Sequence, residues 1–151
     1  MFLKKCVLVI FAVALSAQTS YSQRQSCSTA ESNKADREAG RLRTWDALYR
    51  SYNRFAHCDD GSIAEGYSDS VGRILVEQWE TLPRLVILAN NGGFHKFVLR
   101  HVDATLDTRE LEKIRTNAVH RCPAGKEDLC EQLVRAADEA LKANGVVVRG
   151  R

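Results

Sequence analysis

The sequence predicts an all-α fold, a single-domain bundle of five or six helices stapled by disulfides. Apolar residues recur every three or four positions almost throughout residues 36–145, which is the period of an amphipathic helix. The chain contains only two prolines, Pro83 and Pro123, so long helices are permitted. No two segments alternate strictly between apolar and polar residues, so we expect no sheet.

The first 22 residues have the organisation of a secretory signal peptide. Lys4 and Lys5 precede an apolar run from Cys6 to Leu15, and small or polar residues follow as far as Ser22. The apolar run is too short to span a bilayer, which needs about 20 residues. We therefore expect a secreted or periplasmic protein with no stable membrane anchor once the signal peptide is cleaved.

A flexible leader and a long helix are predicted next. Residues 23–35 are polar and hold no apolar side chain larger than alanine, which is typical of a leader. The first helix is predicted over residues 36–57 and ends at the turn sequence Asp59-Asp60-Gly61. Its apolar stripe consists of Leu42, Trp45, Tyr49, Tyr52 and Phe55.

The second helix is predicted to begin at Ser62. Ser62 and Glu65 have the spacing of a capping box, in which each side chain bonds the other residue's backbone amide. Ala64, Ser68 and Gly72 then follow four residues apart, and such a row of small side chains predicts the close approach of another helix.

The remaining helices follow with short connections. Pro83 fits the first turn of a short helix that is apolar on more than one side, and we expect this helix to be central in the fold. Asp107 and Glu110 form a second capping-box pattern. The predicted ranges are 82–89, 94–106, 107–122, a last helix whose apolar stripe runs from 129 to 141, and a C-terminal tail at 146–151.

The cysteines of the mature chain are predicted to form two disulfides. Removal of Cys6 with the signal peptide leaves Cys27, Cys58, Cys122 and Cys130, and disulfides persist in an oxidising compartment. Four cysteines allow three pairings. We favour Cys122–Cys130 with Cys27–Cys58, because Cys122 ends one helix and Cys130 lies early in the next, across a tight corner.

The cysteines could instead bind zinc or form a redox pair. A zinc site could combine His57 and Cys58 with His120 and Cys122, but these residues lack the tight local spacing of zinc ligands. No Cys-x-x-Cys sequence is present for a redox pair. We therefore expect no metal and no cofactor.

The charge of the mature chain argues against nucleic-acid binding. Removing Lys4 and Lys5 leaves 20 of the 22 basic residues against 19 acidic ones. Nucleic-acid-binding domains usually carry a basic patch or stripe, and the sequence contains none. Residues 57–72 instead hold four acids and no lysine or arginine, which makes them a candidate interaction surface formed by Asp59, Asp60, Glu65 and Asp69.

These features favour an exported, non-enzymatic binding protein with a protein partner. The plan of a small, exported, disulfide-bearing helical bundle resembles that of the immunity proteins of type VI secretion amidase effectors, which implies a periplasmic immunity or inhibitor protein against a toxin or hydrolase. A third alternative is a small secreted hydrolase that uses carboxylates near Asp59 and Glu65. Against it, the chain lacks the Gly-x-Ser-x-Gly and His-Glu-x-x-His motifs.

Overall fold

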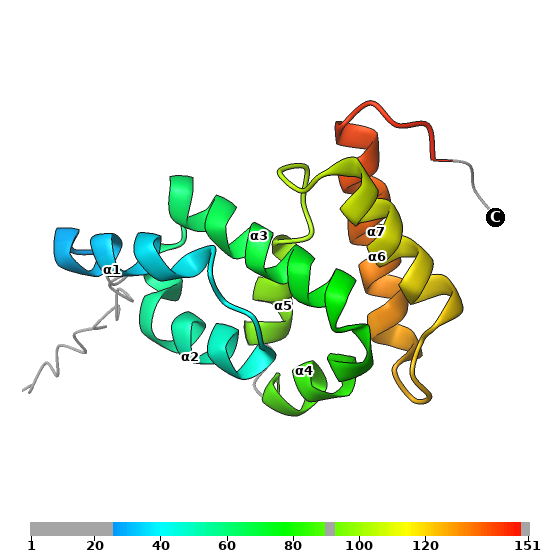
Figure 1. Cartoon of the computed structure of the whole chain (residues 1–151), viewed down its shortest axis with the longest axis horizontal. Coiled ribbons are helices and arrows are strands. Elements are labelled where there is room, and N and C mark those ends of the chain that lie inside the picture. The colour runs from blue at the N-terminus through cyan, green and yellow to red at the C-terminus, as the bar shows by residue number, and fades with distance from the viewer. Residues whose placement is uncertain (1–25, 90–92, 149–151) are drawn as a thin grey trace, which may run out of the picture.

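The computed structural model describes residues 26–89 and 93–148 (Figure 1). Within these ranges every regular element is helical, which confirms the all-α prediction with seven α-helices in place of five or six. The helices are α1 (Thr29–Ala39), α2 (Trp45–Phe55), α3 (Gly61–Glu77), α4 (Leu82–Leu88), α5 (Gly93–Arg100), α6 (Thr108–His120) and α7 (Glu127–Ala143), with short 3-10 turns at Ala56–Cys58 and Trp79–Thr81. The predicted signal peptide and the last three residues of the tail lie outside the described residues.

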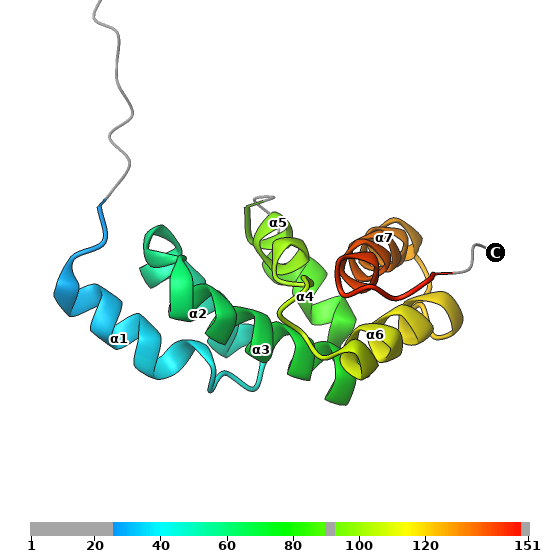
Figure 2. The same cartoon turned by 90° about the horizontal axis from the view of Figure 1, so that it is seen from above.

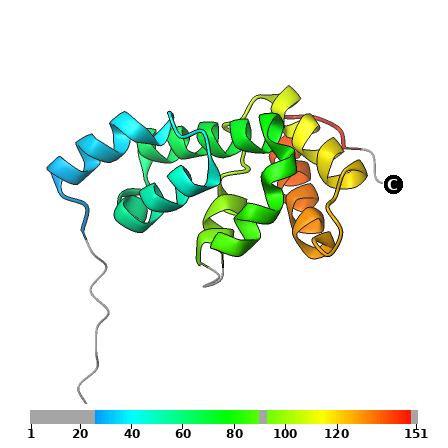
Figure 3. The ribbon, with the colours of Figure 1, turned by 60° about the horizontal axis from the view of Figure 1, so that its bottom comes forward.

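The long helix α3 connects the two ends of the molecule. It contacts α1 and α2 at one end and α6 at the other, while α4 and α5 lie between them (Figures 2 and 3). Helices α6 and α7 form an antiparallel pair around the Pro123–Gly125 corner. No helix in the described ranges is both long and apolar enough to cross a membrane.

Helix α1 begins inside the segment predicted to be a flexible leader, so that prediction was wrong for residues 29–35. Ser28 and Glu31 form a complete capping box: the Ser28 amide donates to Glu31 Oε2 at 3.1 Å, and the Glu31 amide donates to Ser28 Oγ at 3.3 Å. The buried face of α1 consists only of Ala35 and Ala39, both fully buried. This face is too small to show as an apolar stripe in the sequence.

The predicted helix over residues 36–57 is in fact two helices separated by a bend. Thr44 ends the bend, because its hydroxyl accepts the Ala47 amide at 3.2 Å and so starts α2. Ser70 of α3 fixes the bend through two hydrogen bonds. Its hydroxyl donates to the Ala39 carbonyl at 2.5 Å and accepts from the Leu42 amide at 3.1 Å. A tertiary contact therefore satisfies the backbone groups that the helix ends leave free.

One of the two predicted capping boxes is present. Asp107 and Glu110 form it at the start of α6, as predicted. At the start of α3, Asp60 is the N-cap in place of Ser62, and its carboxylate accepts the Gly61 amide at 2.8 Å. Ser62 instead donates to Asp36 of α1 at 2.6 Å, so its hydroxyl links two helices.

Two of the small residues on α3 lie against the turn that follows α5: Ser68 bonds to His101 and Asp103, and Gly72 lies against Leu106. A Cβ atom placed on Gly72 would lie 2.7 Å from Leu106 Cδ2, which is closer than carbon atoms approach each other. Leu106 is 4 % exposed, so its side chain is already confined by the core. Gly72 is therefore required for the approach of this turn to α3.

We expect Gly72→Leu to destabilise the fold by about 1–3 kcal/mol, since overpacking forces side chains and backbone to move. Urea denaturation followed by circular dichroism measures the change in the free energy of unfolding. Ala30→Leu, at an exposed position of α1, is the matched control and should lie within about 0.5 kcal/mol of wild type. Equal stability of the two variants would show that Leu106 does not confine Gly72.

The structure confirms both predicted disulfides. Cys27 and Cys58 are joined with their Cα atoms 4.9 Å apart, and Cys122 and Cys130 are joined with their Cα atoms 6.0 Å apart. The zinc hypothesis required the thiols of Cys58 and Cys122, and both are joined in disulfides. Two disulfides in a domain of this size indicate an oxidising, extracellular-type environment.

Candidate functional site

The four acids of the predicted interaction surface do not share one environment. Asp60, Glu65 and Asp69 are exposed along α3, where Asp60 caps the helix and Asp69 pairs with Arg73 one turn later. Asp59 differs, because its side chain is only 5 % exposed. The structure thus keeps three of the acids on the surface and places the fourth in the interior.

Asp59 belongs to a buried polar cluster that joins three parts of the chain. Its Oδ2 atom lies 3.2 Å from His101 Nε2 and also pairs with Arg100. The other ring nitrogen of His101, Nδ1, is 3.0 Å from Ser68 Oγ of α3. The Ser68 hydroxyl also donates to Asp103 Oδ2 at 2.8 Å. We call Asp59, Ser68, His101 and Asp103 the buried cluster.

The buried cluster has the residue types of a nucleophilic triad but not its accessibility. Ser68 is 1 % exposed, and its hydroxyl proton is directed to Asp103, so a substrate has no path to the oxygen. Burial raises the pKa of Asp59, but hydrogen bonds and charge from His101 and Arg100 outweigh it, and the net pKa is lowered. A general acid needs a raised carboxyl pKa, so Asp59 is suited to holding the fold together and not to proton donation.

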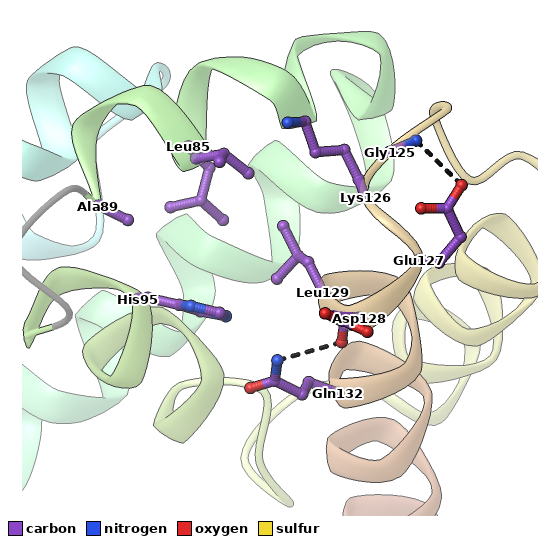
Figure 4. A pocket seen from close by; sticks show the side chains of 10 residues that line it. Leu85, Ala89, His95, Gly125, Lys126, Glu127, Asp128, Leu129 and Gln132 are labelled. Atoms are coloured by element: carbon purple, nitrogen blue, oxygen red, sulfur yellow. Dashed lines mark hydrogen bonds between the residues drawn. The ribbon is translucent and has the colours of Figure 1, made fainter.

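A second site is a cavity of about 570 Å³ that opens between α4, α5 and the start of α7 (Figure 4). We call it the α4–α7 groove. Four apolar residues, Leu85, Val86, Ala89 and Leu129, form its floor. Ile87 of α4 is 61 % exposed and lies on the side of this helix that faces away from the groove residues. The predicted central position of α4 was therefore wrong on this side, because only Leu82 and Leu85 of this helix are fully buried.

The polar lining of the groove includes a histidine with an unsatisfied atom. His95 of α5 lines the groove, and its Nε2 atom is buried with no hydrogen-bond partner among the described residues. Burial lowers the pKa of this imidazole, which favours its neutral form. A buried polar atom without a partner costs about 1–3 kcal/mol, so its presence in a cavity wall marks the groove as a candidate binding site.

Three charged residues, Lys126, Glu127 and Asp128, line the groove. The Lys126 amine and the Asp128 carboxylate lie on opposite sides of Leu129 (Figure 4). The corner that presents them depends on Gly125, whose φ of 72° is left-handed. The Glu127 carboxylate accepts the Gly125 amide at 2.9 Å and holds this corner in place.

Sequence analysis did not identify the groove, because its residues come from three helices and a corner. The available signal was that α4 lacks a polar face, which fits a helix with one side in the core and another facing a cavity. In the parts of the chain that the structure describes, no group of three His, Cys, Asp or Glu residues is placed to hold a metal ion. Comparisons of the chain with models of known protein families, with curated proteins and with solved structures found no match.

Proposed function

We propose that this chain is an exported, non-enzymatic binding protein that holds its ligand or partner in the α4–α7 groove. The observation that carries the proposal is a cavity of about 570 Å³ with an apolar floor. Ligand pockets commonly have volumes of about 300–1,000 Å³ and combine apolar walls with a few polar groups. The signal-peptide pattern of residues 1–22 and the two disulfides support export.

The closed buried cluster supports a binding role over the hydrolase alternative. Its serine hydroxyl and its histidine are 1 % and 2 % exposed, so they serve the interior of the fold. The α4–α7 groove is open to solvent, and none of the described residues that line it has a hydroxyl or thiol group. Its side chains are of the kind that orient a bound molecule through charge and apolar contact.

We expect Val86→Asp to abolish retention of the native ligand or partner, because Val86 lines the apolar groove and a carboxylate there must be desolvated on binding. Val147→Asp is the matched control, since Val147 is 85 % exposed and lies in the C-terminal tail, outside the groove. Native mass spectrometry of wild type and both variants, purified from the native envelope, identifies what co-purifies. Retention should fall about tenfold or more for Val86→Asp alone.

Equal retention by wild type and both variants would contradict the groove as the binding site. If the co-purifying molecule is a hydrolase, its activity should be assayed with and without added protein. Loss of that activity with wild type but not with Val86→Asp would support the inhibitor form of this proposal.

A further inference from the structure

We propose that Ser68, His101 and Asp103 form a pH-dependent switch. When His101 loses a proton, the Ser68 hydroxyl turns towards the imidazole, and the turn after α5 loses its hydrogen bond to α3. This inference does not depend on the α4–α7 groove. Its basis is the number of protons that the hydrogen bonds of the buried cluster require, since each bond needs one donor and one acceptor.

The single proton of the Ser68 hydroxyl is used by Asp103. A carboxylate can only accept, and Asp103 Oδ2 lies 2.8 Å from Ser68 Oγ. The other carboxylate oxygen, Oδ1, accepts from the amide and the hydroxyl of Thr105 at 2.8 and 2.6 Å, so Asp103 is an acceptor on both sides. Ser68 Oγ must therefore accept from His101 Nδ1, which is 3.0 Å away and carries a proton.

The other ring nitrogen of His101 carries a proton for a separate reason. His101 Nε2 lies 3.2 Å from Asp59 Oδ2, which also accepts from Arg100. The pKa of Asp59 is lowered, so this carboxylate is ionised at neutral pH and can only accept. With both nitrogens protonated, His101 is an imidazolium, and the chain of hydrogen bonds from Asp59 to Asp103 is complete.

The neighbours of the ring determine which nitrogen gives up its proton. Nε2 of His101 faces an ionised carboxylate, which has no proton to donate in return. Nδ1 faces the Ser68 hydroxyl, which can rotate and donate to it once the Nδ1 proton has passed to solvent. Ser68 Oγ then has no proton for Asp103, and two acceptor oxygens face each other at 2.8 Å. We expect this repulsion to move Asp103 and its turn away from α3.

No other group around the ring changes its charge near neutral pH. The titratable and charged groups that face His101 are Asp59 from the turn before α3, Tyr67 of α3, Arg100 of α5 and, through Ser68, Asp103. Burial raises the pKa of Tyr67, which stays neutral, and the pKa of Asp59 lies below its ordinary value. Histidine is the side chain whose ordinary pKa lies between about pH 5 and 8, so the proton on His101 sets the direction of the Ser68 hydroxyl.

NMR of the ¹⁵N-labelled protein, with both disulfides formed, tests the switch between about pH 5 and 8.5. The shifts of the ring nitrogens report the protons on His101. We expect both nitrogens to be protonated at the acidic end and Nε2 alone at the basic end. The Leu106 amide donates to the Asp103 carbonyl at 3.2 Å and reports the turn. Its protection from hydrogen exchange, corrected for the intrinsic effect of pH, should fall about threefold or more with the midpoint of the His101 titration.

Ser68→Ala separates the two halves of the switch. It removes the hydroxyl that connects them, so His101 should still titrate while the protection of Leu106 no longer follows it. Thr116→Ala removes an exposed hydroxyl from α6 and is the matched control, which should respond as wild type does. Circular dichroism verifies that each variant is folded.

Asp103→Asn is a second test that does not depend on the folding of Ser68→Ala. Its amide group can donate to Ser68 Oγ after the hydroxyl has turned, so Leu106 should stay protected throughout the pH range. A persistent response in a folded Asp103→Asn or Ser68→Ala variant would overturn the switch. So would a neutral His101 that is protonated at Nδ1, a His101 ring that keeps one charge state across the range, or constant protection of Leu106 in wild type.

Discussion

Replacing His101 by leucine is expected to lower the free energy of unfolding by about 3 kcal/mol, the upper end of the usual cost of removing one hydrogen-bond partner from a buried polar group. Leucine preserves the apolar contact with Phe97, whose ring centroid lies 4.4 Å from that of the imidazole. The Asp59 carboxylate, however, loses one of its two Oδ2 partners, and its Oδ1 atom is already buried with no partner among the described residues. Urea denaturation of wild type and variant measures the loss.

The double variant His101→Leu/Asp59→Asn is the control for a purely steric effect. A neutral amide at position 59 removes the buried charge that has lost its His101 partner, so the double variant should be more stable than His101→Leu by about 1 kcal/mol or more. If the double variant is less stable than His101→Leu, the carboxylate is not the source of the cost.

The lowered pKa of Asp59 adds a dependence on pH with a definite sign. Because the folded-state pKa lies below the ordinary value of 3.8, the folded protein binds fewer protons there than the unfolded chain. The stabilisation is fully present above that ordinary value and is lost as the pH falls through the folded-state pKa. In Asp59→Asn this contribution is absent, so its stability should fall less steeply than that of wild type below about pH 4. Urea midpoints measured across this range would contradict the assignment if the two slopes were equal.

Loss of the Cys27–Cys58 disulfide is expected to cost about 3.7 kcal/mol, and loss of Cys122–Cys130 about 2.6 kcal/mol, in the chain-entropy model of disulfide stabilisation. The difference arises because the first pair is separated by 31 residues and the second by 8. The double variants Cys27→Ser/Cys58→Ser and Cys122→Ser/Cys130→Ser act as controls for each other in thermal or urea unfolding. A larger loss for the short loop would contradict the order of these costs.

Helices that bury a stripe of large apolar side chains could be predicted from the sequence. Helices that bury only small side chains could not. Helix α6 follows its capping box Asp107–Glu110 and its predicted range closely. Helix α1 has the same type of cap at Ser28 and Glu31, but it buries only alanines against α3, where a Cβ atom on Gly66 would lie 3.0 Å from Ala39 Cβ. Close packing of small residues contributes to stability without producing an amphipathic pattern.

The candidate sites depend on contacts between residues that are distant in the sequence. Asp59 was predicted to be a surface acid because it lies in a turn, and it is buried because His101, 42 residues later, supplies a partner for its charge. The α4–α7 groove likewise requires Leu85 and Leu129 to face each other from separate helices. No local pattern contains this information, whereas the pairing of the cysteines followed from the short corner that connects α6 and α7.

Both disulfides join cysteines that are consecutive among the described residues, Cys27 with Cys58 and Cys122 with Cys130. A polypeptide that crosses a membrane N-terminus first presents its cysteines to the oxidising side in this order. In such a polypeptide, Cys27 and Cys58 meet before Cys122 and Cys130 have emerged. If this chain is exported as proposed, we expect its oxidative folding to need only a thiol oxidase, with a yield that does not depend on a disulfide isomerase.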